Sequence, residues 1–184
     1  MRSTVLLFLA GCGVEYQPEC AAVLLDAEDS VRCSGLCINE FMANNIDTWL
    51  LDPDDEGEEA YPDWIELYNG GGPIADTSAY TLVRDDSPFE ITSVLPEGSL
   101  ESGECLLIIA DGRSDQSEPD IPHVGFNLNK EYGGIRLQKT RGPGCLVDRV
   151  WYDDQARGVS WQRQPTDGGE DWASQVAATP CGMN

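Results

Sequence analysis

The feature that most constrains the fold is a succession of short apolar segments that starts at Ile38 and is broken repeatedly by Gly, Pro, Asp and Asn. Short segments between turn residues are typical of an all-β sandwich or barrel, and no stretch keeps the period of a long helix. The segments predicted to form strands are Ile38–Ala43, Asp63–Tyr68, Tyr80–Val83, Phe89–Ile91, Cys105–Ala110, Gly134–Gln138, Val147–Tyr152 and Val159–Arg163.

Side-chain alternation indicates which faces of these strands are buried. Within residues 63–68, Ile65 and Leu67 share one face, because successive side chains point to opposite sides of a strand. Residues 106–109 are all apolar, which predicts a strand that is covered on both of its faces. The sequence therefore predicts at least one strand that lies deep in the molecule.

The charge of the chain excludes one class of partner. The 184 residues include 33 acids and 11 bases, so the formal net charge is −22. A surface with this balance repels phosphate, which nucleic-acid-binding proteins neutralise with lysine and arginine. The length corresponds to one domain with short flanks. We therefore expect one acidic domain that does not bind nucleic acid.

The N-terminus resembles an export signal. Residues 1–11 carry one positive charge and then an apolar run that ends in small residues before Cys12. Residues 9–12, Leu-Ala-Gly-Cys, resemble the lipobox of bacterial lipoproteins, in which the cysteine becomes the acylated N-terminus. This resemblance implies a signal peptide over 1–11, a membrane anchor at Cys12 and a place in the cell envelope. Because Gly13 follows the cysteine, the outer membrane is expected in a two-membrane bacterium.

The alternative is that Val5–Leu9 forms a buried strand and that Cys12 is an ordinary thiol. The segment is short for a signal peptide, whose apolar part usually has about 7 to 15 residues. Residues 12–36 are expected to form a cysteine-containing tether before the predicted sandwich.

The remaining cysteines predict disulfides. Without Cys12 the count is even, as expected for pairing in an oxidising compartment, and it allows fifteen connectivities. One proposed pair joins residues that each open a predicted strand, a second joins the first strand to the C-terminal end, and the third lies in the tether. These pairs are Cys105–Cys145, Cys37–Cys181 and Cys20–Cys33.

A zinc site is the competing interpretation of two of these cysteines. Cys33 and Cys37 are separated by three residues, a spacing that occurs in zinc sites. A structural zinc ion needs four clustered ligands, and the single histidine of the chain, His123, is far away in the sequence. His123 lies between Pro122 and Val124, where we expect a loop.

Several motifs follow one another along the predicted sandwich. They are Ile-Asn-Glu-Phe-Met-Ala-Asn-Asn at 38–45, Asp-Trp-Ile-Glu-Leu-Tyr-Asn at 63–69, Leu-Pro-Glu-Gly-Ser-Leu at 95–100, Gly-Glu-Cys-Leu-Leu-Ile-Ile-Ala-Asp at 103–111 and Val-Asp-Arg-Val-Trp-Tyr at 147–152. Their order resembles that of the bacterial lamin-tail domain. The resemblance implies an immunoglobulin-like β-sandwich over 37–184, of a kind found in extracellular surface modules. It supplies no catalytic residues, and the cysteines at 105, 145 and 181 depart from the family pattern.

The function expected from these features is that of a noncatalytic surface interaction or structural module. No nucleophile elbow, phosphate loop or zinc-protease motif is present in the sequence. Two alternatives stay open. One is a glycan-binding or adhesive protein, with Trp161 and Trp172 as candidate stacking residues, and the other is a small carboxylate-dependent hydrolase. Exposed aromatic side chains around a hollow would favour the first, and two facing carboxylates in a cleft would favour the second.

An acidic segment between the first two predicted strands is a candidate calcium site. Carboxylates at Asp52, Asp54, Asp55 and Glu56 could supply several of the oxygen ligands that calcium takes. The alternative is a solvated acidic loop, because blocks of like charge repel one another. No other cofactor is expected.

Overall fold

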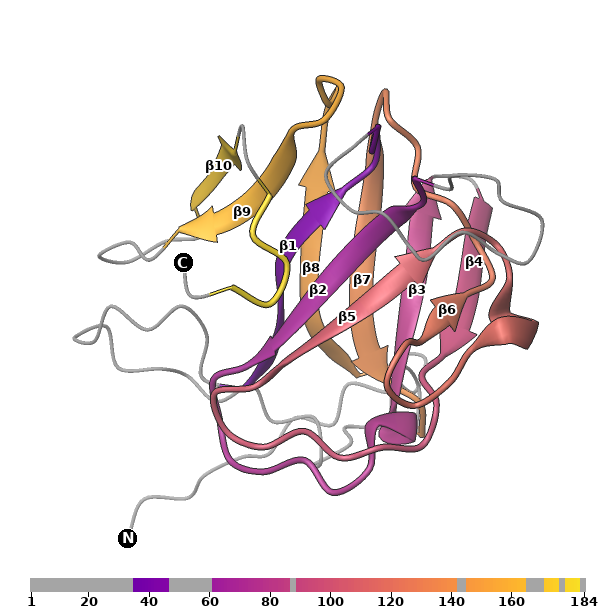
Figure 1. The fold of residues 1–184 in the computed structure, drawn as a ribbon. Helices are drawn as coiled ribbons and strands as arrows, with labels where there is room; N and C mark the ends of the chain where they lie inside the picture. The colour runs from indigo at the N-terminus through magenta and orange to yellow at the C-terminus, as the bar shows by residue number, and fades with distance from the viewer. Residues whose placement is uncertain are drawn as a thin grey trace, which may run out of the picture.

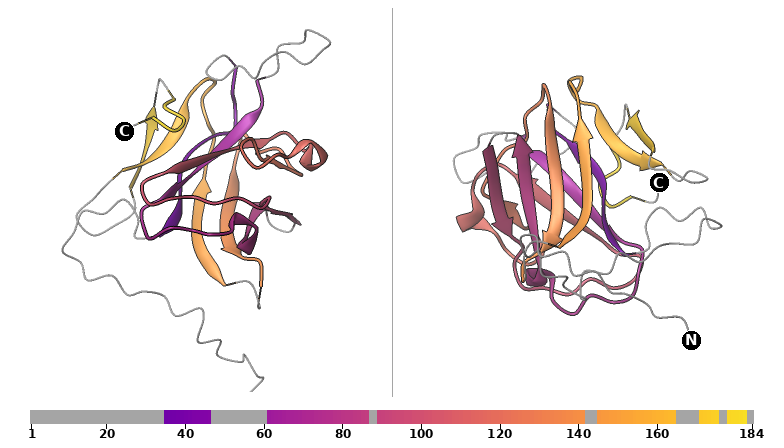
Figure 2. Two further views of the ribbon diagram at one scale, coloured as in Figure 1. Left: turned by 60° about the horizontal axis from the view of Figure 1, so that its bottom comes forward. Right: turned by 180° about the vertical axis from the view of Figure 1, so that it is seen from behind.

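The computed structural model describes residues 35–46, 61–86, 89–141, 145–164, 171–175 and 178–182. They form an immunoglobulin-like all-β sandwich, as predicted, in which two sheets face each other (Figures 1 and 2). The strands are β1 (Leu36–Met42), β2 (Asp63–Asn69), β3 (Tyr80–Asp86), β4 (Phe89–Val94), β5 (Cys105–Ala110), β6 (His123–Val124), β7 (Gly133–Lys139), β8 (Leu146–Tyr152), β9 (Ser160–Gln164) and β10 (Asp171–Gln175). The helical structure within the described ranges consists of two 3-10 turns, Thr77–Ala79 and Ser114–Gln116. None of the helices in this part of the chain has the length and apolarity needed to cross a membrane.

The two sheets differ in width. One has six strands in the order β10-β9-β1-β2-β5-β6, and the other has four in the order β4-β3-β7-β8. Neighbouring strands are antiparallel except β5 and β6, which run parallel. Seen from behind in Figure 2, the smaller sheet lies in front of β1, β2 and β5, and β9 and β10 extend beyond its edge.

The core between the sheets is built from the predicted alternation. Ile65 and Leu67 of β2 are fully buried in it, together with apolar residues of the facing sheet such as Leu82 and Ile135. Ile108 of β5 enters this core, whereas Ile109 belongs to a second apolar cluster on the opposite face of the same sheet. The prediction that the strand at 105–110 is covered on both faces is therefore confirmed.

A register shift in β1 changes which residues face outward. The shift lies between Ile38 and Glu40, and it places Glu40 opposite Glu66 of β2. Asn39 donates from Nδ2 to Glu66 Oε1 at 2.5 Å, so it lies on this outer face as well. Such bulges add one residue to a strand and re-aim the side chains next to it.

Residues 178–182, which we call the C-terminal strap, cover this outer face. Ala178 packs against the cluster of Met42, Trp64 and Ile109. The strap ends in a turn in which the Gly182 N–H donates to the Thr179 carbonyl at 2.8 Å and Cys181 has a φ of 53°. Proline at the second position and a left-handed residue at the third are typical of a type II turn. The strap is thus a short third layer over β1, β2 and β5 (Figure 1).

Candidate functional site

A hollow of about 310 Å³ opens where the start of β7, the end of β8 and β9 meet. Most of its wall is aromatic, and its one acidic lining residue within the described chain is Asp153. The lining comes from three successive segments of the chain, which belong to both sheets: Tyr132, Gly133, Trp151, Tyr152, Asp153 and Trp161. The sandwich fold is therefore what assembles this site.

Two adjacent glycines allow the aromatic rings to lie where they do. Gly134 pairs with Trp151, and a Cβ added to this glycine would lie 2.6 Å from the indole ring. Gly133 pairs with Tyr152, and a Cβ there would lie 2.5 Å from the phenol oxygen. Aromatic side chains commonly cover glycines on a neighbouring strand in this way. Any larger residue at either position would displace a ring of the hollow.

The aromatic rings that line the hollow differ in their exposure to solvent. Tyr152 is buried, while Tyr132 and Trp151 are 56% and 52% exposed. Trp161 is half-buried and packs against Phe41 of the core, with 6.5 Å between the ring centroids. The Arg149 guanidinium lies 5.6 Å from the Trp151 ring centroid. The exposed rings therefore share the hollow with two rings that pack into the core.

This arrangement suits binding better than catalysis. Aromatic faces stack on the apolar face of a sugar ring, and a nearby carboxylate accepts hydrogen bonds from its hydroxyl groups. A glycosidase of the usual kind needs two carboxyl groups that flank the bond to be cleaved. The described lining of this hollow offers one, Asp153.

Trp161 and Trp172, the two tryptophans singled out in the sequence, have different positions. Both are half-buried and pack against Phe41, and Trp161 also lines the hollow. Trp172 lies under the Arg163 guanidinium, which is 4.9 Å from its ring centroid. Tyr132 and Trp151 were not among the site residues predicted from the sequence. An apolar side chain in an outward position of β8 was the available signal for Trp151, because it alternates with buried Val150 and Tyr152.

The observed disulfide corrects two predicted pairs. Cys105 is bonded to Cys181 with a Cα–Cα distance of 5.6 Å, so the pairs Cys105–Cys145 and Cys37–Cys181 are wrong. Cys105 opens β5 on the outer face that the C-terminal strap crosses, whereas Cys145 precedes β8 in the other sheet. Cys37 and Cys145 are also disulfide-bonded.

Several predicted site residues lie outside the described part of the chain. They are the proposed lipidation site Cys12, the tether cysteines Cys20 and Cys33, and the candidate calcium ligands Asp52, Asp54, Asp55 and Glu56. The anchor and the calcium site therefore stay predictions.

His123 lies in a short strand, not in the loop that the sequence suggested. Its Nδ1 is 3.0 Å from Asp111 Oδ2, and its backbone N–H donates to Ser117 Oγ at 3.1 Å. Among the described residues, no hydroxyl group is hydrogen-bonded to His123 Nε2, so this pair lacks the nucleophile of a catalytic triad. These two contacts join His123 of β6 to residues that lie between β5 and β6.

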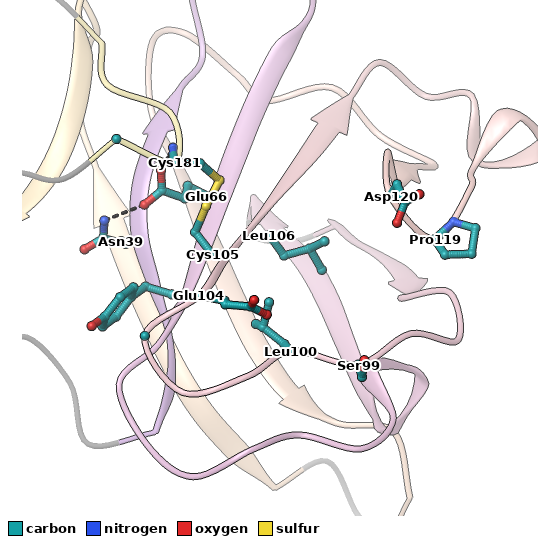
Figure 3. Close-up of a pocket in the computed structure, with 13 residues that line it drawn as sticks. Asn39, Glu66, Ser99, Leu100, Glu104, Cys105, Leu106, Pro119, Asp120 and Cys181 are labelled. Carbon is teal, nitrogen blue, oxygen red and sulfur yellow. Dashed lines mark hydrogen bonds between the residues drawn. A yellow bond between two sulfur atoms is a disulfide. The ribbon is translucent and has the colours of Figure 1, made fainter.

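A larger cavity of about 750 Å³ lies beside the C-terminal strap (Figure 3). The Cys105–Cys181 disulfide, Glu66 and Asn39 form one side of it, and Glu104 and Asp120 lie elsewhere on its wall. Glu66 accepts hydrogen bonds from Asn39 Nδ2 and from the Cys181 N–H, each at 2.5 Å. The cavity is polar and acidic, which distinguishes it from the aromatic hollow.

Among the described residues, Asp63 at the start of β2 is a carboxyl group whose environment clearly changes its pKa. Burial raises the pKa of Asp63 to about 7, and the hydrogen bond that it accepts from the Leu128 N–H at 3.0 Å opposes this shift. Burial also raises the pKa of the Tyr152 phenol, as does the negative charge of Asp86. Asp63 and the Tyr152 phenol therefore both lie in a poorly hydrated environment.

Comparison with known proteins leaves the family of the chain open. No family model matches the sequence, and no curated protein matches it. The likeness to lamin-tail domains therefore remains an interpretation of the sequence motifs.

Proposed function

We propose that this protein is an exported, noncatalytic surface module that binds a sugar unit of a glycan in the aromatic hollow. The observation that carries the proposal is a hollow lined by two exposed rings, Tyr132 and Trp151, together with the half-buried Trp161 and the acidic residue Asp153. Exposed apolar side chains that gather in one patch are typical of interaction sites. Rings that are held in place lose little conformational entropy on binding.

The disulfides support the export part of this proposal. Cys37, Cys105, Cys145 and Cys181 are all disulfide-bonded, and stable disulfides are rare in a reducing cytosol. In this proposal the chain is tethered through a lipid on Cys12, which keeps the hollow near the cell surface. The lipid attachment is tested by replacing Cys12 with alanine, which should release the protein from the membrane fraction.

Calorimetry with soluble sugars tests the binding site. Titration with cello-, chito- and mannooligosaccharides, and with polysaccharide from the producing cell's own envelope, should give saturable heat with at least one of them. Trp151→Ala should weaken that binding by about tenfold or more, as expected for an aromatic residue at the centre of a binding site.

Leu146→Ala is the matched control for Trp151→Ala. Leu146 is 54% exposed on the same strand and is not part of the hollow, so its replacement should leave the affinity unchanged. Equal affinity of the parent and Trp151→Ala, or no saturable heat from any of these sugars, would exclude the hollow as a glycan site.

A further inference from the structure

The disulfide beside the larger cavity has a third potential metal ligand next to it. Cys105 Sγ, Cys181 Sγ and a carboxylate oxygen of Glu66 all lie within 4.8 Å of one another. Glu66 is 1% exposed and reaches this place from β2, while the cysteines come from β5 and the C-terminal strap (Figure 3). Two thiolates and a carboxylate are ligands that zinc accepts.

The C-terminal strap has anchors that do not depend on the sulfur–sulfur bond. Thr179 donates from its backbone N and from Oγ1 to the two carboxylate oxygens of Glu40, each at 3.1 Å. The Cys181 N–H donates to Glu66, and Ala178 packs against the apolar cluster under the strap. These contacts keep Cys181 close to Cys105 when the disulfide is open.

We propose that reduction of the Cys105–Cys181 disulfide converts this place into a zinc site formed by both thiolates and Glu66. A dithiol reductant gives two electrons and two protons to the disulfide, becomes a disulfide itself, and leaves two free thiols on the protein. Zinc binding then displaces the two thiol protons into solution, because the thiolate is the form that binds metal. This inference does not depend on glycan binding.

The geometry needed for zinc is close to the geometry present. Zinc–sulfur distances are about 2.3 Å, so two thiolates in a tetrahedral site lie roughly 3.8 Å apart. The Cα–Cα distance of 5.6 Å lets the side chains reach this separation by rotation about their own bonds. The fourth ligand is a water molecule supplied from the cavity that Cys105, Cys181 and Glu66 all line.

Asn39 holds the carboxylate in position for this role. Its Nδ2 donates to Glu66 Oε1, which fixes the rotation of the carboxylate. Hydrogen bonds to a ligating group from a surrounding residue tune metal affinity in this way. Cys105 and Cys181 would therefore link the strap to the sheet in both redox states, directly when oxidised and through zinc when reduced.

The test uses the full chain, reduced with a limited amount of a phosphine under nitrogen until mass spectrometry shows that Cys105 and Cys181 are free. Titration with zinc should then reveal one site, and cobalt at the same site should give a sulfur-to-cobalt charge-transfer band. Zinc should also protect Cys181 from alkylation. The oxidised protein should show none of these effects.

Three variants distinguish the site from unspecific metal binding. Replacing both cysteines with serine should abolish the cobalt band, and Glu66→Gln should weaken zinc binding by at least about tenfold while both thiols remain. Glu104→Gln is the matched control, because Glu104 lines the same cavity and is not part of the three-ligand group. Its zinc affinity should equal that of the parent.

Two results would overturn the proposal. One is zinc affinity that is the same in Glu66→Gln and in the parent. The other is a reduced protein that binds no zinc, whether it keeps its near-ultraviolet circular dichroism or loses it, since loss would mean that the non-covalent anchors do not hold the strap. Neither result bears on binding at the aromatic hollow.

Discussion

The outer faces of the two sheets differ in whether a further described segment of the chain covers them. On the six-stranded sheet, Trp64, Glu40 and Glu66 are buried, because the C-terminal strap lies over them and is fixed by a disulfide. On the four-stranded sheet, Trp151 is half exposed and no strap from the described ranges covers it. Both sheets alternate side chains in the same way. The covering layer is what makes one face structural and leaves the other free to meet a ligand.

Ion pairs take the place of a covering layer on the open face. Arg136 of β7 contacts Asp85 of β3 at 3.1 Å and Glu90 of β4 at 3.0 Å. The guanidinium lowers the pKa of Glu90 through this hydrogen-bonded pair. The Glu90 side of this network is exposed, and exposed pairs contribute little to stability, so this part of the open face can change with less effect on folding than the covered face.

The largest contrast in stability is expected between alanine variants of Trp64 and Trp151. Trp64→Ala should lower the free energy of unfolding by about 3 to 5 kcal/mol, because it empties a fully buried site under the strap. Trp151→Ala should lower it by less than about 1 kcal/mol. Urea unfolding of both variants measures the difference. Similar losses in the two variants would mean that the faces are not distinct.

Removal of the strap disulfide should have the next largest effect. Replacing Cys105 and Cys181 with alanine should cost about 2 to 4 kcal/mol, chiefly because the unfolded chain gains freedom. The Thr179 and Cys181 amides should stay protected from hydrogen exchange, because Glu40 and Glu66 still accept their hydrogen bonds. Full exchange of these amides in an otherwise protected protein would show that the disulfide alone holds the strap.

Sequence patterns predicted the strands of this fold better than its assembled sites. The β5 bounds were predicted correctly, because four apolar residues and flanking turn residues define that strand locally. The two-residue β6 was missed, since its pairing with β5 comes from the tertiary fold. The partner of Cys105 was missed for the same reason, because it depends on where the strap crosses the sheet. The aromatic hollow was missed because it forms only when the folded sheet places Trp151 and Tyr152 beside Gly134 and Gly133 of β7.

A third prediction concerns Asp63, a largely buried carboxylate with fewer hydrogen-bond donors around it than Glu40 has. Glu40 accepts three hydrogen bonds, whereas the described contacts of Asp63 include one, from Leu128. Because the pKa of Asp63 is raised in the folded state, the folded protein holds this proton longer than the unfolded chain does. Its contribution to stability is therefore present at low pH and is lost as the pH rises from about 4 to about 7.

Asp63→Asn tests this prediction, since an amide oxygen can still accept the Leu128 hydrogen bond. The variant should gain stability over the parent as the pH rises to 8, by on the order of 1 to 3 kcal/mol after allowance for the water that reaches this group. The two proteins are compared by urea unfolding at pH 4 and pH 8. A difference that does not change with pH would contradict the raised pKa.

The smallest effect is expected for an ion pair on the open face. Glu90→Gln removes the exposed partner of Arg136, which keeps its contact with Asp85, so the loss of stability should be smaller than for any of the variants above. Salt should reduce this loss further, because it screens exposed charges. Unfolding in low and high sodium chloride measures it, and a loss that grows with salt would be the contrary outcome.

The most direct test of the central claim is to follow the tryptophan indole N–H signals by NMR while a binding sugar is added. The claim is that ligands meet the aromatic hollow and not the strap-covered face. The Trp151 and Trp161 signals should move in proportion to the bound fraction, and the Trp64 signal should stay in place. Movement of the Trp64 signal with no change at Trp151 would contradict the account.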